Sequence, residues 1–122
     1  MENSAALING TSVVFAQGNS VDFGVEILKV VQAGEIVIVV PIRPPSIDNS
    51  NNNVYSFSIK GDFLWRLETK GTEFDRHTTP SECKFVDASF RPDGDLILFN
   101  WCDFAFRVNP DDGHILERFE SR

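Results

Sequence analysis

The residue types best suited to chemistry lie in one polar stretch near the middle of the chain. Cys83 and His77 stand six residues apart, with the carboxylates of Asp75 and Glu82 nearby. A cysteine beside a histidine could form a thiolate–imidazolium pair, and the same groups also bind metal ions. No second cysteine or histidine stands at a metal-ligand spacing, however, and Cys83 immediately precedes an expected strand. We therefore interpret this stretch as a solvated loop and expect no catalysis, metal or cofactor there.

Acidic groups in two turns are the second candidate. Asp93 and Asp95 flank one glycine, and Asp111 and Asp112 precede another. Neither group has the ligand spacing of a calcium-binding loop. Aspartate is common in turns because its side chain accepts hydrogen bonds from nearby backbone N–H groups. Turn capping is therefore the simplest interpretation of these four residues.

The two tryptophans, Trp65 and Trp101, could stack on a ligand. Trp65 alternates with polar residues in an expected strand, so we expect it to pack in the core. Trp101 stands in an expected turn, and its position leaves core packing and surface recognition both open.

The elements that must position these residues are predicted to be strands. Short apolar runs alternate with polar residues between clusters of Gly, Pro, Asn and Asp, and no window shows a 3.6-residue period over ten residues. We predict an all-β fold, an antiparallel meander of about nine strands. These lie at residues 11–16, 23–31, 35–42, 54–59, 63–68, 84–90, 96–100, 104–108 and 114–120. The strand at 35–42 is apolar on both faces, so it should be a central strand.

One pattern occurs twice in the chain. The order strand, turn glycine, strand, loop, strand, turn glycine, strand spans about residues 23–68 and again 84–120, with a linker at 69–83. Such self-similarity constrains an architecture more tightly than any single segment can. We expect a single all-β domain over residues 1–122 that contains two four-stranded, blade-like units.

Parts of both units resemble blades of β-propeller families. Residues 85–98, with their Pro-Asp-Gly turn, resemble the start of a WD-type blade. Residues 101–108 resemble its next hairpin, with Asp103 at a position that this family usually fills with aspartate. Residues 54–57 and 61–66 are similar to the pyrroloquinoline-quinone-type repeat. The resemblance implies a blade-like meander.

Propellers typically close with four to eight blades, whereas this chain has two such units. The units must therefore bury their faces in another way. We expect them to pack on each other as a sandwich or a bent barrel-like sheet. The alternative is that identical protomers assemble a ring.

The charge balance narrows the class of partner. The formal net charge is −7 at pH 7, and the sequence pI is about 4.7. Nucleic-acid binding depends on Lys and Arg that neutralise phosphates, so we expect no nucleic-acid partner and favour a basic protein. The longest apolar run, residues 36–40, is far shorter than the roughly 20 residues that cross a bilayer. With no signal-peptide pattern at the N-terminus, we predict no membrane partner, a cytoplasmic location, and a monomer or dimer.

Cys83 and Cys102 are the two cysteines of the chain. They could form one disulfide. In a cytoplasmic protein, two free and buried thiols are the expected state.

Residues 41–53 form a long excursion in the first unit, where the second unit has a short turn. Proline cannot donate a ladder hydrogen bond, and the asparagine run that includes Asn51 and Asn52 carries no hydrophobic anchor. We expect a mobile tip. The segment is either a tolerated insertion or a binding loop held out by the sheet.

Four interpretations of the function are carried forward. The leading one is a non-catalytic protein-binding domain whose acidic surface neutralises a basic partner; in type, it resembles the small acidic immunity proteins that bacteria pair with toxins. The candidate partner-binding residues are Asp93, Asp95, Asp111, Asp112, Trp101, Asn51 and Asn52. One alternative is a two-blade module that oligomerises into a propeller and binds a small ligand or glycan on Trp65 or Trp101. The others are an enzyme using Cys83 and His77, and a structural domain of unknown role.

Overall fold

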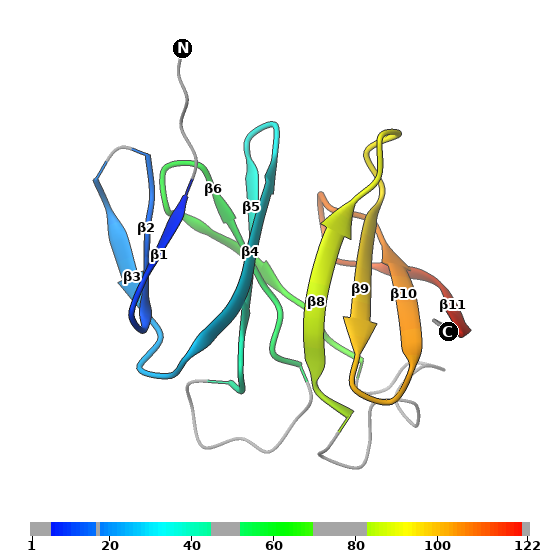
Figure 1. Cartoon of the computed structure of the whole chain (residues 1–122). Coiled ribbons are helices and arrows are strands. Elements are labelled where there is room, and N and C mark those ends of the chain that lie inside the picture. The colour runs from blue at the N-terminus through cyan, green and yellow to red at the C-terminus, as the bar shows by residue number, and fades with distance from the viewer. Residues whose placement is uncertain (1–5, 17, 45–51, 70–82, 121–122) are drawn as a thin grey trace.

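The computed structural model describes residues 6–16, 18–44, 52–69 and 83–120, which form eleven strands in three antiparallel sheets (Figure 1). These residues contain no α-helix, and therefore no helix long and apolar enough to cross a membrane. The all-β prediction is confirmed.

Each sheet is a meander whose strands follow the order of the chain. The N-terminal sheet contains β1 (Leu7–Asn9), β2 (Ser12–Val14) and β3 (Ser20–Asp22). The middle sheet contains β4 (Ile27–Ala33), β5 (Ile36–Pro41), β6 (Tyr55–Ser58) and β7 (Phe63–Arg66). The C-terminal sheet contains β8 (Phe85–Phe90), β9 (Leu96–Asn100), β10 (Phe104–Val108) and β11 (Ile115–Glu120). The middle and C-terminal sheets are the two predicted four-stranded units.

The N-terminal sheet is the main departure from the predicted strands. The strand expected at residues 11–16 corresponds to β2, whereas β1 and β3 lie outside every predicted strand. Both are three residues long, which is too short for an alternating pattern to be recognised. Their register places Ile8, Val13 and Val21 opposite one another, and Val13 and Val21 pack toward the middle sheet.

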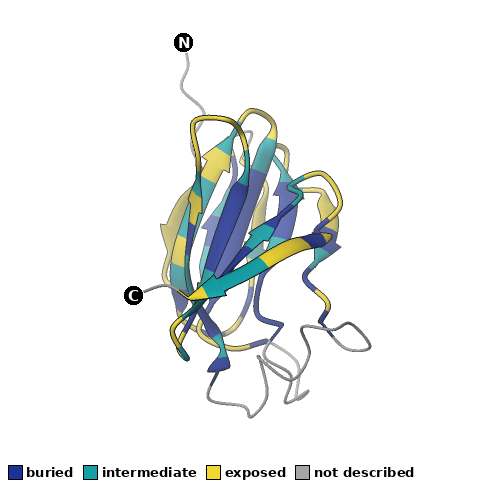
Figure 2. Ribbon diagram, turned by 90° about the vertical axis from the view of Figure 1, so that its right-hand side faces the viewer, coloured by how far each residue is buried: buried dark blue, intermediate teal, exposed yellow. Residues whose placement is uncertain are grey.

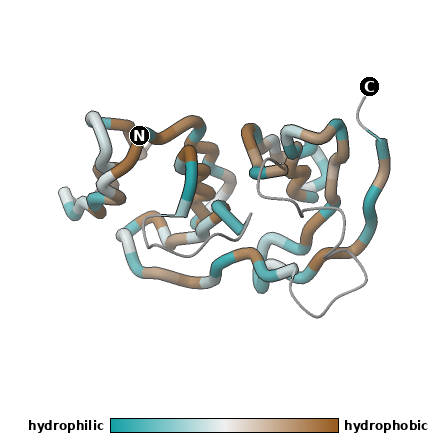
Figure 3. The backbone as a smooth tube through the Cα atoms, turned by 90° about the horizontal axis from the view of Figure 1, so that it is seen from below, coloured by the Kyte–Doolittle hydropathy of each residue, from teal (hydrophilic) through white to brown (hydrophobic). Residues whose placement is uncertain are grey.

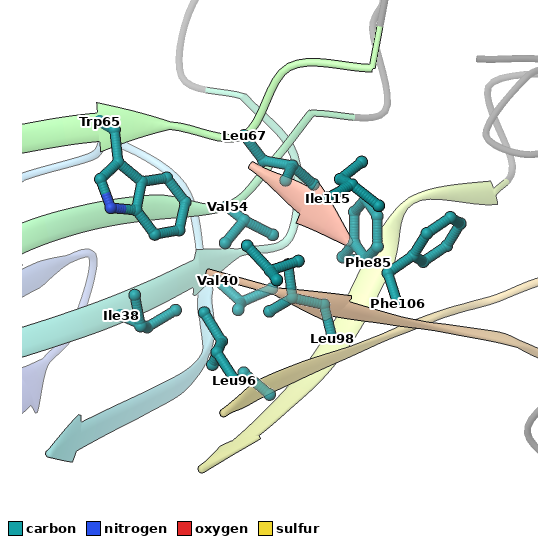
Figure 4. Close-up of a cluster of buried hydrophobic side chains, with 12 residues drawn as sticks. Ile38, Val40, Val54, Trp65, Leu67, Phe85, Leu96, Leu98, Phe106 and Ile115 are labelled. Atoms are coloured by element: carbon teal, nitrogen blue, oxygen red, sulfur yellow. The ribbon is translucent and has the colours of Figure 1, made fainter. Parts of the chain in front are cut away.

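The middle sheet is covered on both faces. Val37 and Val39 of β5 pack in a cluster with the N-terminal sheet, whereas Ile38 and Val40 pack in a cluster with the C-terminal sheet. All four side chains are fully buried, and β5 has a strand on each side. The prediction of a central strand is therefore confirmed. Figure 4 shows the second cluster, which includes Trp65 as expected.

The first strands of the three sheets lie next to one another. β4 packs along β8, and β1 approaches β4. Seen from below (Figure 3), the N-terminus and the C-terminus lie at opposite sides of the molecule, because the three sheets succeed one another across it. None of the three sheets closes into a barrel, so the arrangement is the sandwich-like form of the prediction.

Two turn glycines hold neighbouring sheets close together. Gly61, at φ 95°, lies against the ring of Phe15, so that an added Cβ would stand 3.0 Å from it. Gly113, at φ 80°, lies against Trp65, and an added Cβ would stand 2.5 Å from its ring. The indole Nε1 of Trp65 also donates a hydrogen bond to the carbonyl oxygen of Pro110 (2.9 Å). Only glycine combines a positive φ with such close approach.

Asn53 joins the middle sheet to the C-terminal sheet. Its side chain is fully buried. Its Nδ2 donates to the carbonyl oxygens of Pro41 (2.7 Å) and Phe85 (2.8 Å), and its Oδ1 accepts from the backbone N–H of Phe85 (2.9 Å). One side-chain amide thus forms hydrogen bonds with three buried backbone groups from two sheets. These bonds offset the free-energy cost of burying polar groups.

The expectation of free thiols is wrong: Cys83 and Cys102 form a disulfide. The register of the C-terminal sheet explains the pairing. Phe85 lies opposite Asn100, and the backbone N–H of Trp101 donates to the carbonyl oxygen of Lys84 (2.9 Å). Continuing this ladder by one residue places Cys83 opposite Cys102, with their Cα atoms 5.2 Å apart, inside the range that a disulfide spans.

Ser56 and Ser58, two residues apart in β6, provide a test of hydrogen bonding in this core. Ser56 is fully buried beside Ile38 and Trp65, and its Oγ is without a hydrogen-bond partner. The Oγ of Ser58 accepts from the N–H groups of Lys60 and Asp62 (3.2 Å each).

Ser56→Ala should therefore raise the free energy of unfolding by about 1 kcal/mol, because it removes an unpaired buried hydroxyl. Ser58→Ala, the matched change, should lower it by about the same amount. Urea denaturation measures both. A larger destabilisation by Ser56→Ala than by Ser58→Ala would contradict the absence of a hydrogen-bond partner at the hydroxyl of Ser56.

Candidate partner-binding surface

Four tight turns lie at the same end of the molecule, the upper end in Figure 1. They join β4 to β5, β6 to β7, β8 to β9, and β10 to β11. We call this the turn end. The β1–β2 and β9–β10 turns lie at the opposite end, with the ends of β5 and β7. In Figure 2 the loops of the turn end are mostly exposed, and the strands that lead into them carry most of the buried residues.

Carboxylates gather at the turn end. The exposed ones are Glu35, Asp62, Asp93, Asp111 and Asp112, and Asp95 is partly buried. Lys60 and Arg91 are exposed cations in the same turns. The acidic groups outnumber these two, so the turn end carries a negative charge. The antiparallel meander accounts for the gathering, because alternate turns of a meander fall on one side.

The turn-capping interpretation is confirmed for two of the aspartates. The Oδ1 of Asp93 accepts a hydrogen bond from the backbone N–H of Asp95 (3.0 Å), and the Oδ1 of Asp112 accepts from that of His114 (2.9 Å). In the second turn, the Oδ1 of Asn109 accepts from the N–H of Asp111 (2.9 Å). Each capping aspartate remains exposed, so its charge still faces solvent.

Asp95 differs from the other aspartates because it belongs to an ion-pair network. Arg107 Nε lies 2.9 Å from Glu117 Oε1, and Arg107 Nη1 lies 3.5 Å from Asp95 Oδ2. The hydrogen bond to Glu117, together with the charge of Asp95, raises the pKa of Arg107. Asp95 therefore shares the single positive charge of Arg107 with Glu117, and the three side chains together keep one negative charge.

Two other predicted partner-binding residues lie away from the turn end. Trp101 is 69% exposed in the β9–β10 turn, at the opposite end. Asn52 is buried; its Nδ2 donates to Glu68 Oε1 (2.9 Å), and its Oδ1 accepts from Thr69 Oγ1 (3.1 Å). Asn51 lies outside the described residues. The structure thus brings the four predicted aspartates together and separates Trp101 and Asn52 from them.

A family model described as "Domain of unknown function (DUF7957)" matches residues 5–119. The chain belongs to this family. A search of the curated proteins found no match. The matched range covers β1 to β10 and all but the last residue of β11. The family domain is therefore the three-sheet fold as a whole, and the turn end lies within it.

Of the polar stretch around His77 and Cys83, the structure describes only Cys83. His77, Asp75 and Glu82 lie outside the described residues, and the sulfur of Cys83 is bonded to Cys102. Within the described part of the chain, no three His, Cys, Asp or Glu side chains are grouped as metal ligands would be. In the disulfide form, Cys83 cannot serve as a thiolate nucleophile.

Three exposed apolar residues near the turn end were not among the predicted site residues. Phe63 is 60% exposed, Leu64 46% and Leu116 42%. The internal repeat relates two of these residues. When Gly61 is aligned with Gly113, Leu64 and Leu116 take equivalent positions in the two units. In both copies this leucine follows an apolar residue, which hides its exposure in a simple alternation pattern.

Proposed function

We propose that this domain is a non-catalytic binding module whose turn end docks on a basic protein surface. The observation that carries the proposal is the gathering of exposed carboxylates from four turns and two sheets at one end. The turns are short and capped by hydrogen bonds, so the charges are held in place before a partner arrives. A surface whose negative charges are fixed in position favours binding to a positively charged surface of a partner.

The charge of the whole chain acts in the same direction. A formal net charge of −7 attracts a basic protein during diffusional approach. At about 0.15 M salt the Debye length is about 8 Å, so exposed rim charges act mainly on the association rate. A bacterial toxin with a basic substrate-binding surface is the partner that this mechanism suits best, which would make the domain an immunity protein.

The alternative of ring closure by several copies has less support. Phe106 packs toward the middle sheet, so Arg107 and its cross-strand neighbour Glu117 face the outer side of the C-terminal sheet. In the aligned repeat, Glu117 takes the position of Trp65, which in the middle sheet packs against the next sheet. An ion pair at this position suits a solvent-facing surface better than contact with a further sheet, so the C-terminal sheet should be the last of the series. This favours a monomer or a dimer.

The cytoplasmic location remains a prediction. The disulfide of Cys83 and Cys102 is the state that oxidising compartments favour. A partner met outside the cytoplasm is therefore as compatible with the proposed binding as one met inside it.

A triple variant tests the role of the turn end. Asp93→Asn, Asp111→Asn and Asp112→Asn together remove three charges, and asparagine retains the capping oxygen of Asp93 and Asp112. Proteins captured by the wild-type domain from a lysate of its source should be basic. For such a partner, the triple variant should slow association by about tenfold or more at low salt, and release should change less than about threefold.

The matched control removes carboxylates at the opposite end. Asp103 and Glu26 are exposed there, and Asp103 has φ 68°, which asparagine tolerates. Asp22 is unsuitable, because hydrogen bonds from Thr11 (2.7 Å) and the Gly24 N–H (2.9 Å) hold the pKa of its carboxyl below the usual value. Asp103→Asn with Glu26→Gln should leave association nearly unchanged. Equal slowing by both sets, or capture of acidic proteins or nucleic acid, would contradict the proposal.

A further inference from the structure

At one corner of the turn end, the edge of the middle sheet meets the β10–β11 turn. Trp65 of β7 makes the contact: its Nε1 donates to Pro110, and its ring lies against Gly113. Asp111 and Asp112 stand between these two residues in the chain. The edge strand β7 and the acidic turn therefore form one continuous surface, which we call the β7 corner.

Two exposed leucines lie beside the β7 corner at irregular points of edge strands. Leu64 adjoins Trp65 on β7, and Leu116 follows Gly113 by three residues, near the start of β11. Ser56 pairs with Trp65 and Phe57 with Phe63, so Leu64 is the extra residue of a register shift. Arg107 pairs with Glu117 and Val108 with Ile115, so Leu116 is the extra residue of a second shift. Bulge residues have no cross-strand partner, and a bulge redirects the side chain it carries.

Single exposed apolar residues are common on protein surfaces and need no explanation. Here, however, Phe63 and Leu64 are consecutive on β7, and β7 and β11 are both edge strands of their sheets. Three exposed carboxylates accompany them: Asp62 precedes Phe63, and Asp111 and Asp112 lie in the adjoining turn. An apolar centre with a charged rim is the usual arrangement of a protein–protein interface.

We propose that the β7 corner is the apolar centre of the contact with the basic partner, and that the partner inserts an apolar side chain flanked by Lys or Arg. This inference rests on the proposed function and names the part of the surface that holds the partner once it has docked. The carboxylates select a positively charged partner, because they pair with its cations during docking. Leu64 and Leu116 then supply the dry contact that slows release.

A second copy of this chain fits the β7 corner poorly. Two copies meeting through it in a two-fold arrangement would bring like patches together. Asp62, Asp111 and Asp112 of one copy would then face the same carboxylates of the other, and like charges facing each other across an interface are unfavourable. Lys60, in the β6–β7 turn, would offset only one of these three charges.

Peptides displayed on phage provide a defined probe. A random twelve-residue library is selected against the wild-type domain, and the affinity of the selected peptides is measured on four proteins: the wild type, Leu64→Asn with Leu116→Asn, the charge-neutralised triple variant described above, and Leu7→Asn. Leu7 is 65% exposed on the N-terminal sheet and is the matched control. Phe63 is left unchanged because its ring packs against the ring of Phe57, with the two ring centroids 6.0 Å apart.

We expect peptides in which Lys or Arg flank an apolar residue. The double leucine variant should bind them at least tenfold more weakly, with faster release and an unchanged melting temperature, and Leu7→Asn should bind like the wild type. Peptides that depend on the aspartates but not on Leu64 and Leu116 would overturn this inference and leave the proposed function standing. Peptides that depend on neither group would overturn both. If the library yielded no binders, the inference that the β7 corner binds an apolar side chain would be overturned.

Discussion

Trp65→Ala should lower the free energy of unfolding by about 3–5 kcal/mol, as large-to-small changes of buried aromatic residues do. Trp65 is 7% exposed and packs between the middle and C-terminal sheets. Its removal would leave a void above Gly113 and an unpaired carbonyl at Pro110. Urea denaturation monitored by far-ultraviolet circular dichroism measures the change.

Trp101→Ala is the control for this substitution. Trp101 is 69% exposed, so its loss should change the stability by less than about 0.5 kcal/mol. Trp65→Phe keeps a buried ring but removes the hydrogen bond and part of the ring volume, so its cost should be about 1 kcal/mol for the bond plus a packing term. Equal effects of Trp65→Ala and Trp101→Ala would contradict the packing of the C-terminal sheet on the middle sheet.

Asn53→Ala should cost about 3 kcal/mol or more, because it leaves several buried backbone groups without a partner. The groups are the N–H and carbonyl oxygen of Phe85 and the carbonyl oxygen of Pro41. Asn19 supplies the comparison: it is exposed, and its Nδ2 makes one bond to the carbonyl oxygen of Lys60 (2.7 Å). Asn19→Ala should cost no more than about 1 kcal/mol.

Asn53→Asp separates the two roles of the amide. Aspartate keeps an acceptor for the N–H of Phe85 but cannot donate to the two carbonyl oxygens, and it buries a charge. It should therefore be as destabilising as alanine at neutral pH. A stability close to that of the wild type would mean that Asn53 does not join the two sheets.

Much of the fold could be predicted from the sequence because strand alternation and turn residues are local signals. The central position of β5 follows from its two apolar faces, which only a strand covered on both sides can bury. The gathering of the four aspartates follows from the meander, since the β8–β9 and β10–β11 turns must lie at the same end.

The rest depended on register and on contacts between distant residues. The prediction of free thiols was wrong because the expected compartment carries no information on geometry, whereas the register of the β8–β9 hairpin places Cys83 opposite Cys102. The burial of Asn52 depends on Glu68 and Thr69, which no local pattern connects to it. The exposure of Leu64 and Leu116 comes from register shifts, and bulges are not visible in the pattern of apolar residues.

The most direct test of the account is to locate the bound partner on the surface of the domain. Backbone amide signals of the isotope-labelled domain are compared by nuclear magnetic resonance with and without a captured basic partner. We predict that the largest changes fall at the turn end, in residues 33–36, 59–64, 91–95 and 109–116. Changes confined to the opposite end, around Thr11, Ile42 and Trp101, would contradict the proposal that the acidic turns recognise the partner.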